Sequence, residues 1–573
     1  MAADDTDRSS AKRGQTIESI ERSLEETCHG LWRRCAGDEI NLVGKLRFTH
    51  MWRIDLPSRL HLHPLVDHLL LCIDIGAVFT EPRIIAPQAD MSMTSPWPHV
   101  EPMGLLCLPK TSFESPLERR SMTCLQNALD LLRMPDAERD NDLRREFLAY
   151  WAQHSCGRIA SSYALIEETP SNREVFFYEF QTNRLIFAED EETLNRWLER
   201  VTGYKPSRLG RTRMIALDRP PTPDEFPQSA RDVYGQAGFE GIERYLPEGE
   251  DLPILLSCAI EDSYVFAGIA LLGASLSRVR RGFRPSAKVP PGTLRRFFKY
   301  VDRFPVQRAD SNWVHGRDAN ESIATLRRKS VAIIGCGALG STIATLLTKE
   351  GTGSILLVDP DQLKPENVSR HELGIETVGQ YKAMALGERI KRELPHIRDV
   401  CGFAHSVEYL QKDDLDKVMS CDLIVTAAIS LEGDSFIEAC LSARKTPPLW
   451  LCTWIEEFAV AGHALLIPRS DRLLSKFNQD GTYKYRLTYE WPEQGGEVPE
   501  PGCASTFQPY NMSDAQASAN MAARLALDAL LGRVTSSVNR QWHGDREIAI
   551  SYGAKLDPSF SCSFRQRERK DNY

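Results

Sequence analysis

The sequence predicts an α/β protein of several domains, and three observations support this fold class. The chain has 573 residues, whereas domains average about 150, so a single core does not account for it. Residues 331–359 read as a strand, a glycine turn, a helix and a second strand, which is the pattern of a parallel α/β sheet. Residues 16–153 read instead as a helix, short strands and further helices, which is the pattern of an α+β domain.

The first predicted domain spans residues 1–154. Its first 14 residues are polar, and we expect them to be frayed. A helix is predicted at 16–35 by apolar side chains at helical spacing, namely Ile17, Ile20, Leu24, Cys28 and Leu31. Short apolar runs between 40 and 87 predict an antiparallel meander, and the proline-rich residues 91–110 predict irregular structure. Two further helical patterns follow, at 121–132 and 142–153.

The second predicted domain, residues 155–309, has the weakest pattern, and we expect a linker or docking domain. Its clearest elements are two paired strands and one helix, at 175–180, 184–187 and 191–201. Proline-rich stretches at 219–227 and 285–291 predict linkers. The sequence of this region shows no catalytic constellation.

The third predicted domain, residues 310–573, carries the most informative motif. Three glycines follow an apolar run at 331–334, namely Gly335, Gly337 and Gly340. Glycine suits this turn because a Cβ would keep the backbone away from a phosphate. A second apolar run at 355–358 leads into Asp359, which is placed to bind a ribose hydroxyl. The motif predicts a nucleotide-binding half-sheet.

Later patterns complete this domain. We expect a helix from 382 to 394, a strand at 422–425 and an alanine-rich helix at 514–531. The tail, residues 534–573, is charged at its end and is predicted to lie on the surface.

Three polar residues after Asp359 favour ATP over a dinucleotide. They follow the order D-x7-N-x2-R-x11-K and are Asn367, Arg370 and Lys382. Two cations and an amide suit a triphosphate, because charge must be neutralised as pyrophosphate leaves. With these residues the region resembles the ThiF and ubiquitin-activating superfamily, whose members adenylate the C-terminal carboxylate of a ubiquitin-like protein. The resemblance implies ATP and Mg²⁺ as cofactors.

The resemblance also implies roles for individual residues. Arg370 and Lys382 would be catalytic cations that bind the phosphates, and Asn367 would orient a phosphate or the attacking carboxylate. Arg317 loosely matches an arginine that reaches the ATP of the partner subunit in relatives. His371 is shared with relatives, and we expect it to have a packing role.

The magnesium ligand departs from the family pattern. Relatives carry Asp-x-x-x-Asp-x-x-Asp here, and the last acid binds the metal. Counting from Asp422 places Ile429 in that position. Glu432 and Asp434 lie close by and are the candidate metal ligands in its place.

A second candidate nucleophile lies in a glycine- and proline-rich segment, residues 493–512. This segment contains Cys503 and precedes the alanine-rich helix. Activating enzymes carry a catalytic cysteine in a crossover loop at this place, so the resemblance implies a thioester on Cys503. The alternative is a structural cysteine.

The first domain resembles the ubiquitin-conjugating fold. Conjugating enzymes usually show His-Pro-Asn eight residues before a cysteine in a short apolar run. Here Pro98 and the apolar surroundings of Cys107 match, whereas Trp97 and His99 depart. The resemblance implies that Cys107 accepts the acyl group, and that His99 takes the role of the asparagine or that this role is absent. The alternative for Cys107 is a buried structural thiol.

Conjugating domain, linker and activating domain in this order resemble the fusion protein of bacterial type II CBASS anti-phage operons. That family conjugates the C terminus of a cyclic-nucleotide synthase, a CD-NTase, to a target. The resemblance implies a CD-NTase as acyl donor, a protein or small-molecule amine as acceptor, and a homodimer. Three rival functions remain open: a sulfur-carrier adenylyltransferase of the MoeB or ThiF type, a non-catalytic scaffold, and a NAD-dependent oxidoreductase.

Composition argues against other classes. The net charge of −9 disfavours a protein that coats nucleic acid. The 14 cysteines include no Cys-x-x-Cys pair, so we expect no zinc. Residues 1–25 lack an apolar signal segment, and the most apolar window, residues 254–276, is broken by Glu261 and Asp262. We therefore expect a cytoplasmic protein with free thiols and no membrane partner.

Overall fold

The computed structural model divides the chain into two compact units. The first comprises Met1–Ser162, Thr169–Arg173 and Thr212–Gln307, and the second comprises Tyr163–Glu168, Glu174–Arg211 and Arg308–Tyr573. The structure describes residues 2–36, 48–57, 66–74, 81–87, 97–112, 114–155, 157–167, 169–234, 236, 238–284, 287–468, 471–479, 482–492, 498–499, 506–507 and 509–570. The three domain ranges given above stay a prediction.

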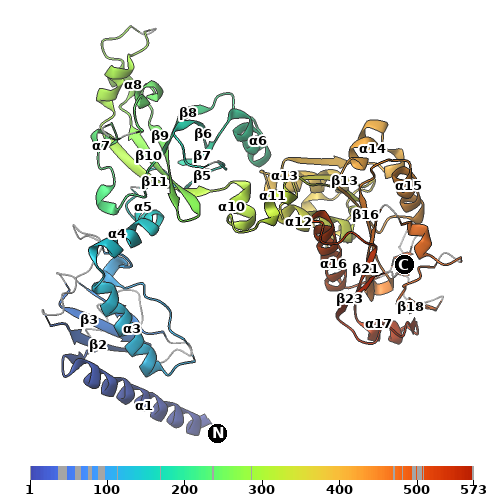
Figure 1. Ribbon diagram of the computed structural model, residues 1–573, viewed down its shortest axis with the longest axis horizontal. Coiled ribbons are helices and arrows are strands. Elements are labelled where there is room, and N and C mark those ends of the chain that lie inside the picture. Colours follow the sequence, from blue (N-terminus) through green and yellow to red (C-terminus); the bar gives the residue numbers. More distant parts are fainter. Residues whose placement is uncertain are drawn as a thin grey trace. The chain divides into compact units, whose positions relative to one another are not determined.

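The N-terminal part of the first unit is an antiparallel meander with helices on one face (Figure 1). Its strands pair in chain order: β1 Trp32–Arg34, β2 His50–Asp55, β3 His68–Ile73 and β4 Arg83–Ile85. Helices α1 (Ala2–Cys28) and α3 (Leu117–Leu132) supply Leu24 and Leu125 to the core that Trp52 and Leu71 form on this face. The predicted meander is thereby confirmed over its described strands. Of its first apolar run, residues 42–47 lie outside the described part of the chain.

Two helix boundaries differ from the prediction. Helix α1 begins at Ala2, so the expectation of a frayed start is wrong. It ends at Cys28 because Gly30 takes the left-handed backbone conformation, with φ +80°. The helix predicted at 142–153 is two helices, α4 (Asp136–Arg145) and α5 (Phe147–Gln153), because Glu146 between them leaves the helical conformation.

The first unit also holds a sheet of longer strands. They are β8 (Gly210–Ala216), β9 (Leu252–Ile260), β10 (Ser263–Leu272) and β11 (Tyr300–Arg308), with β8–β9 parallel and the other pairs antiparallel. Glu261 and Asp262 form the turn of the β9–β10 hairpin, which explains why two acids interrupt the most apolar window of the sequence. Three short helices connect these strands: α7 Ala230–Tyr234, α8 Leu276–Val279 and α9 Pro291–Leu294.

The second unit begins with a small strand–helix module. It contains β5 (Ser162–Ala164), β6 (Arg173–Gln181), β7 (Arg184–Ala188) and α6 (Glu191–Thr202). The strands and helix predicted at 175–201 are confirmed. Arg200 of α6 donates to the carbonyls of Pro395 and Ile397, which ties this module to the main sheet of the same unit.

The main sheet has the order β14-β13-β12-β15-β16-β17-β21-β23. The first five strands are parallel: β14 Asp399–Phe403, β13 Ser354–Val358, β12 Ser330–Ile334, β15 Leu423–Ala427 and β16 Leu449–Ile455. The last three are antiparallel: β17 Ala461–Ile467, β21 Val538–His543 and β23 Arg565–Lys570. The strands predicted around the glycine motif are confirmed. The tail, predicted to lie on the surface, supplies the edge strand β23.

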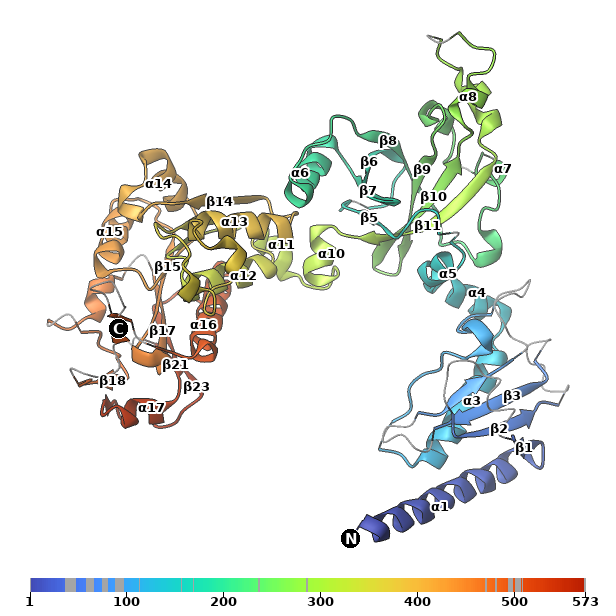
Figure 2. The same ribbon diagram turned by 180° about the vertical axis from the view of Figure 1, so that it is seen from behind.

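Helices cover both faces of this sheet (Figures 1 and 2). One face carries α12 (Ala338–Lys349), α13 (Lys382–Glu393) and α16 (Met512–Leu530), and the other carries α14 (Lys412–Met419) and α15 (Leu431–Ser442). A hydrophobic core lies on each face of the sheet, and successive residues of β12 point to opposite faces. Ile333 therefore packs in one core and Ile334 in the other. The sheet is therefore a doubly covered α/β sheet, as predicted.

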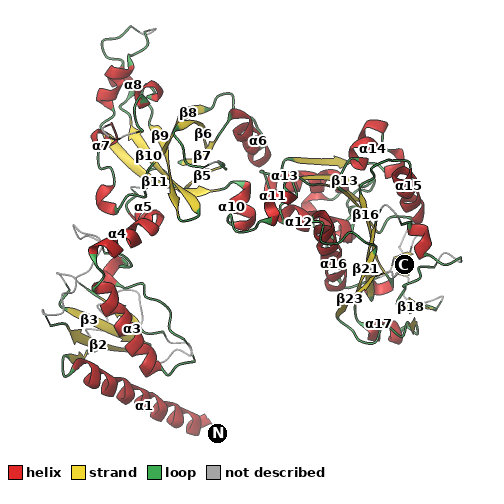
Figure 3. Cartoon of the chain, viewed as in Figure 1, coloured by secondary structure: helices red, strands yellow, loops and turns green. Residues whose placement is uncertain are grey.

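Smaller elements complete the second unit (Figure 3). They are α10 Ser311–Gly316, α11 Ser322–Leu326, α17 Arg546–Ser551, β18 Thr488–Tyr489 paired with β22 Lys555–Leu556, and β19 Val498–Pro499 paired with β20 Thr506–Phe507. In the part of the chain that the structure describes, every helix is too short or too polar to cross a lipid bilayer.

Candidate nucleotide and acyl-transfer sites

A cavity of about 340 Å³ lies at the carboxyl ends of β12, β13 and β15. The strand order runs outward from β12 in both directions, and ligands bind at such a switch point in open α/β sheets. Four residues predicted to bind nucleotide line it, namely Gly335, Gly337, Asp359 and Lys382. Its volume is in the range of sites for small ligands.

The three glycines of the motif have different surroundings. Gly335 has φ +88°, and a Cβ there would lie 2.5 Å from the carbonyl oxygen of Ala427. A Cβ on Gly340 would lie 1.8 Å from the carbonyl oxygen of Gly335. A Cβ on Gly337 would meet no protein atom within 4 Å, and Gly337 caps the N-terminus of α12. The fold explains Gly335 and Gly340, whereas Gly337 leaves open space at the N-terminus of α12, where a helix can bind an anion.

Asp359 links the end of β13 to the glycine turn. One carboxylate oxygen accepts the backbone N–H of Cys336 at 2.6 Å, and the other accepts that of Asp361 at 2.8 Å. Burial raises the pKa of Asp359, although both backbone hydrogen bonds favour the charged form. A carboxylate has further lone pairs, so these contacts leave acceptor capacity for a ribose hydroxyl.

Lys382 begins helix α13 and lines the same cavity. Its Nζ lies 2.9 Å from the Asp361 carboxylate, and the residue is only 9% exposed. Asp361 itself is largely exposed and also lines the cavity. The buried ammonium therefore has one ordered partner and keeps further N–H donors for a phosphate.

Asn367 and Arg370 lie outside the residues that line this cavity. The Asn367 side chain accepts the backbone N–H of Lys364 at 3.1 Å and caps its own 3₁₀ turn. The Arg370 guanidinium lies 5.0 Å from the ring centre of Tyr510, which does line the cavity. Arg317 is exposed at the C-terminus of α10 and is also absent from the lining. Of these three residues, Arg370 is thus placed beside a residue of the cavity lining.

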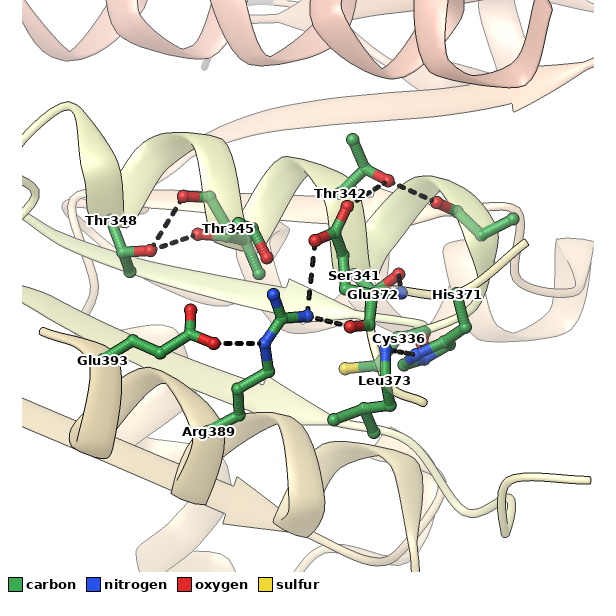
Figure 4. A network of polar contacts seen from close by, with 12 residues as sticks. Cys336, Ser341, Thr342, Thr345, Thr348, His371, Glu372, Leu373, Arg389 and Glu393 are labelled. Atoms are coloured by element: carbon green, nitrogen blue, oxygen red, sulfur yellow. Dashed lines mark hydrogen bonds and ion pairs between the residues drawn. The ribbon is translucent and has the colours of Figure 1, made fainter. Parts of the chain in front are cut away.

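His371 holds the segment that follows Arg370 against the glycine turn (Figure 4). Its Nε2 lies 2.6 Å from the carbonyl oxygen of Cys336, and its Nδ1 accepts the backbone N–H of Leu373 at 3.0 Å. These partners fix the neutral tautomer that carries hydrogen on Nε2. Burial lowers the pKa of His371 to about 4. The expected packing role is therefore a pair of backbone hydrogen bonds.

Glu372 continues this network to both neighbouring helices (Figure 4). Thr342 of α12 donates to its carboxylate at 3.4 Å, and Arg389 of α13 binds both its carboxylate and its carbonyl oxygen. Arg389 also donates to Glu393 at 2.7 Å. Residues 371–372 thereby join the glycine turn, α12 and the helix that carries Lys382, a connection that no sequence motif indicated.

The candidate metal ligands differ in position. Asp434 faces Thr426 and Cys452 inside the domain, and burial raises its pKa to about 6. Glu432 is exposed in the first turn of α15, and neither residue lines the cavity, although Ile429 does. Among the described residues no group of three or more His, Cys, Asp or Glu side chains is arranged to hold a metal ion.

The cavity nevertheless fits Mg²⁺ carried by a nucleotide. This ion is usually held by one or two carboxylates together with phosphate oxygens and water. Asp361 and Glu408 line the cavity, and both are side chains of the type that this ion prefers. These two would hold the ion there, and sequence reasoning did not identify either of them.

Cys107 lies in the first unit and is exposed. Its backbone N–H donates to the carbonyl oxygen of His99 at 2.8 Å, so the Trp97–His99 segment and the cysteine lie side by side. His99 has φ +59°, a conformation that asparagine adopts more readily. The alternative of a buried thiol at Cys107 is wrong.

Both ring nitrogens of His99 bind carboxylates. Nε2 lies 2.9 Å from Asp142, and Nδ1 lies 3.2 Å from Glu146. The hydroxyl of Tyr150 binds the His99 backbone N–H at 2.9 Å. His99 thus anchors the segment beside Cys107 to the α4–α5 corner. Cys503 lies outside the residues that the structure describes.

Comparison with known proteins agrees with this geometry. Residues 316–541 match the ThiF family model. The chain is 25% identical over 487 residues to the ATP-dependent ubiquitin transferase-like protein Cap2 of Pseudomonas aeruginosa, covering 80% of this chain and 84% of that protein. It is 35% identical over 228 residues to Cap2 of Enterobacter hormaechei, covering 37% and 36%. It is 30% identical over 152 residues to ubiquitin-like modifier-activating enzyme 5 of Dictyostelium discoideum, covering 25% and 39%.

Among solved structures, Escherichia coli MccB with ATP is similar with a TM-score of 0.29 and 16% identity, covering 44% of this chain and 65% of that chain. The resemblance inferred from Asn367, Arg370 and Lys382 is confirmed by the family match and by the relatives. Residues 316–541 are a domain of the ThiF family, and most of the chain resembles the Cap2 proteins.

Proposed function

We propose that the chain uses ATP to activate the C-terminal carboxylate of a protein and conjugates it to an amine. The observation that carries this proposal is the cavity around Gly337, whose missing Cβ leaves room for a ligand at the N-terminus of α12. Lys382 supplies a buried cation at the same cavity, and the surrounding domain belongs to the ThiF family. A NAD-dependent oxidoreductase has no need for this cation or for Arg370.

The first step is formation of an acyl-adenylate. An oxygen of the donor carboxylate attacks the α-phosphorus of ATP, the bond to the β-phosphate oxygen breaks, and pyrophosphate leaves. The backbone N–H groups at the glycine turn would bind phosphate oxygens, and Asp359 would bind the ribose. Lys382 and Arg370 would stabilise the negative charge that develops on the phosphates. Magnesium would neutralise phosphate charge. Asp361 and Glu408 would hold the ion, or Glu432 and Asp434 would hold it if the segment after Ile429 rearranges.

Two acyl transfers follow. The Cys503 thiolate attacks the acyl carbon of the adenylate, AMP leaves, and a thioester forms. The Cys107 thiolate then displaces Cys503 from the acyl carbon. An amine finally displaces Cys107, loses a proton and forms an amide. Exposure of Cys107 beside an anchored segment supports its place at the end of this relay.

The partners follow from the resemblance to the Cap2 proteins. The acyl donor would be the C terminus of a CD-NTase, and the acceptor a protein or small-molecule amine. The protein would act in the cytoplasm as a homodimer, in which Arg317 would reach the ATP bound by the partner subunit.

Three variants test the order of the relay. With ATP and the acyl donor, Cys107→Ala should leave a thioester on Cys503 that thiols remove. Cys503→Ala should form adenylate but load neither cysteine. Cys107→Lys should trap the donor as an amide that survives thiol treatment, because an amine replaces the final thiol.

Non-reducing gels and intact masses read out all three variants. Cys562→Ser is the matched control, since Cys562 is also exposed and lies outside both sites. Loading of Cys107 in the Cys503→Ala protein would show direct transfer from the adenylate and contradict the relay.

A further inference from the structure

The second unit contains another and larger cavity, of about 600 Å³. It lies at the amino ends of β12, β13 and β14, whereas the nucleotide cavity lies at their carboxyl ends. The residues that precede these strands line it, including Arg328, Gly353 and Arg398. Helix α6 closes the other side with Trp197. None of the residues assigned to nucleotide binding or acyl transfer lies there.

The cations of this cavity keep unused binding capacity. Arg398 donates only to the neutral hydroxyl of Ser354, at 2.9 and 3.1 Å. Among the residues that the structure describes, no carboxylate lies within the 4.0 Å ion-pair distance of the guanidinium of Arg398 or Arg328. These two charges are therefore free to bind an anion.

Three of the acids that line the cavity have partners within the protein. Arg308 binds the Asp310 carboxylate at 2.8 Å, and Arg327 binds Glu167 at 2.8 Å. Asp190 accepts the backbone N–H of Thr193 and caps helix α6. Four acids and four arginines therefore line the wall, and the anion-binding groups are the two exposed arginines without a carboxylate partner in the described part of the chain, Arg398 and Arg328.

A pair of histidines adds an acceptor. His315 Nδ1 lies 2.8 Å from the carbonyl oxygen of Lys349, so it must donate there. The two Nε2 atoms of His315 and His396 lie 2.7 Å apart, so His396 Nε2 donates to His315 Nε2 when both rings are neutral. Burial, with nearby arginines, lowers the pKa of both rings, that of His396 to about 3. His396 Nδ1 then carries a lone pair that accepts a hydrogen bond.

Thr352 contributes a buried residue to the wall of the cavity. It lines the cavity and is only 2% exposed. Its hydroxyl is buried and has no hydrogen-bond partner in the described part of the chain. Buried hydroxyls are rarely left unsatisfied, because the unpaired group costs free energy in the folded state.

We propose that this cavity is a second ligand site, which binds a small molecule bearing an oxyanion and a hydroxyl group. Arg398 and Arg328 bind the phosphate or carboxylate oxygens. His396 Nδ1 accepts a hydrogen bond from the ligand hydroxyl. The proposal does not depend on the adenylation chemistry.

Calorimetric titration of the full chain with glycerol phosphate and with citrate tests the site. These probes are a hydroxylated phosphate ester and a hydroxylated polycarboxylate, so they distinguish the two kinds of oxyanion. At least one should bind once per chain, and neutral glycerol should not bind. Arg398→Gln should weaken binding by about tenfold or more, since a charge-assisted contact is lost. Arg392→Gln is the matched control, because Arg392 is an exposed arginine of α13 outside the cavity.

Two further variants keep the test decisive. Thr352→Val removes the unpaired hydroxyl and preserves the side-chain shape, so it should raise the melting temperature of the free protein and leave probe binding intact. Lys382→Gln alters the nucleotide cavity and should leave probe binding intact. The proposal is overturned if neither probe binds, or if binding is lost in Lys382→Gln but kept in Arg398→Gln.

Discussion

Replacing Gly337 by alanine separates ligand binding from folding at the glycine turn. A Cβ at this position meets no protein atom within 4 Å, and φ is −75°, which any residue adopts. Compared with glycine, alanine loses less conformational entropy on folding but is a poorer helix N-cap. These two effects on the free energy of unfolding nearly cancel. The free energy of unfolding should therefore change by less than about 1 kcal/mol.

The same methyl group should block the phosphates. Loss of one charged hydrogen bond from the turn costs about 1.5–3 kcal/mol, so the Kd for ATP should rise roughly 10- to 150-fold. Calorimetric titration with ATP and Mg²⁺ measures the affinity, and thermal unfolding checks the fold. Gly340→Ala is the contrasting variant, since its Cβ would lie 1.8 Å from the Gly335 carbonyl and should destabilise the domain by about 1–3 kcal/mol or more. Unchanged ATP affinity in Gly337→Ala would refute a phosphate at this turn.

Three further predictions concern the surroundings of the cavity. Arg370→Ala should cost at least about 2–3 kcal/mol of transition-state stabilisation in pyrophosphate exchange, and an unchanged rate would place the arginine outside the reaction. Replacing Asp361 and Glu408 together by alanine should abolish adenylate formation but leave Cys107 open to alkylation, because these two acids line the cavity; retained exchange activity would assign the metal to other carboxylates, such as Glu432 and Asp434. Because burial lowers the pKa of His371 from 6.5 to about 4, the unfolded chain gains a proton first as the pH falls. Its contribution to stability is thus complete above pH 6.5 and falls by up to roughly 3 kcal/mol towards pH 4. His371→Gln should remove this part of the pH dependence in denaturant unfolding, and identical profiles would contradict it.

The parallel sheet was predictable because its signals are local. Apolar runs at 331–334 and 355–358 flank glycines that a tight turn requires, and both became strands within one residue. The hairpin of β9 and β10 was not predicted, because its strands are almost wholly apolar and lack alternation. The tail strand β23 was missed because RQRERK is polar throughout, and only its pairing with β21 makes it a strand.

In the candidate sites, too, the residues of a local motif were predictable, whereas positions set by tertiary contacts were not. Gly335, Gly337, Asp359 and Lys382 meet at one cavity, as the motif predicted. Asn367 lies outside the lining and its side chain makes a capping contact with Lys364, which spacing alone does not reveal.

Glu408 and Tyr510 also line the cavity, and both lie in segments that are distant in sequence from the glycine motif. Such positions depend on tertiary contacts, so no local pattern could have identified them.

The central claim is that this sheet binds ATP for adenylation and not a dinucleotide for hydride transfer. Calorimetric titration of the purified chain with ATP and Mg²⁺, and separately with NAD, tests it most directly. The buried ammonium of Lys382 at the cavity predicts saturable binding of ATP that Lys382→Gln weakens, and no comparable binding of NAD. Tight binding of NAD together with no binding of ATP would contradict the account.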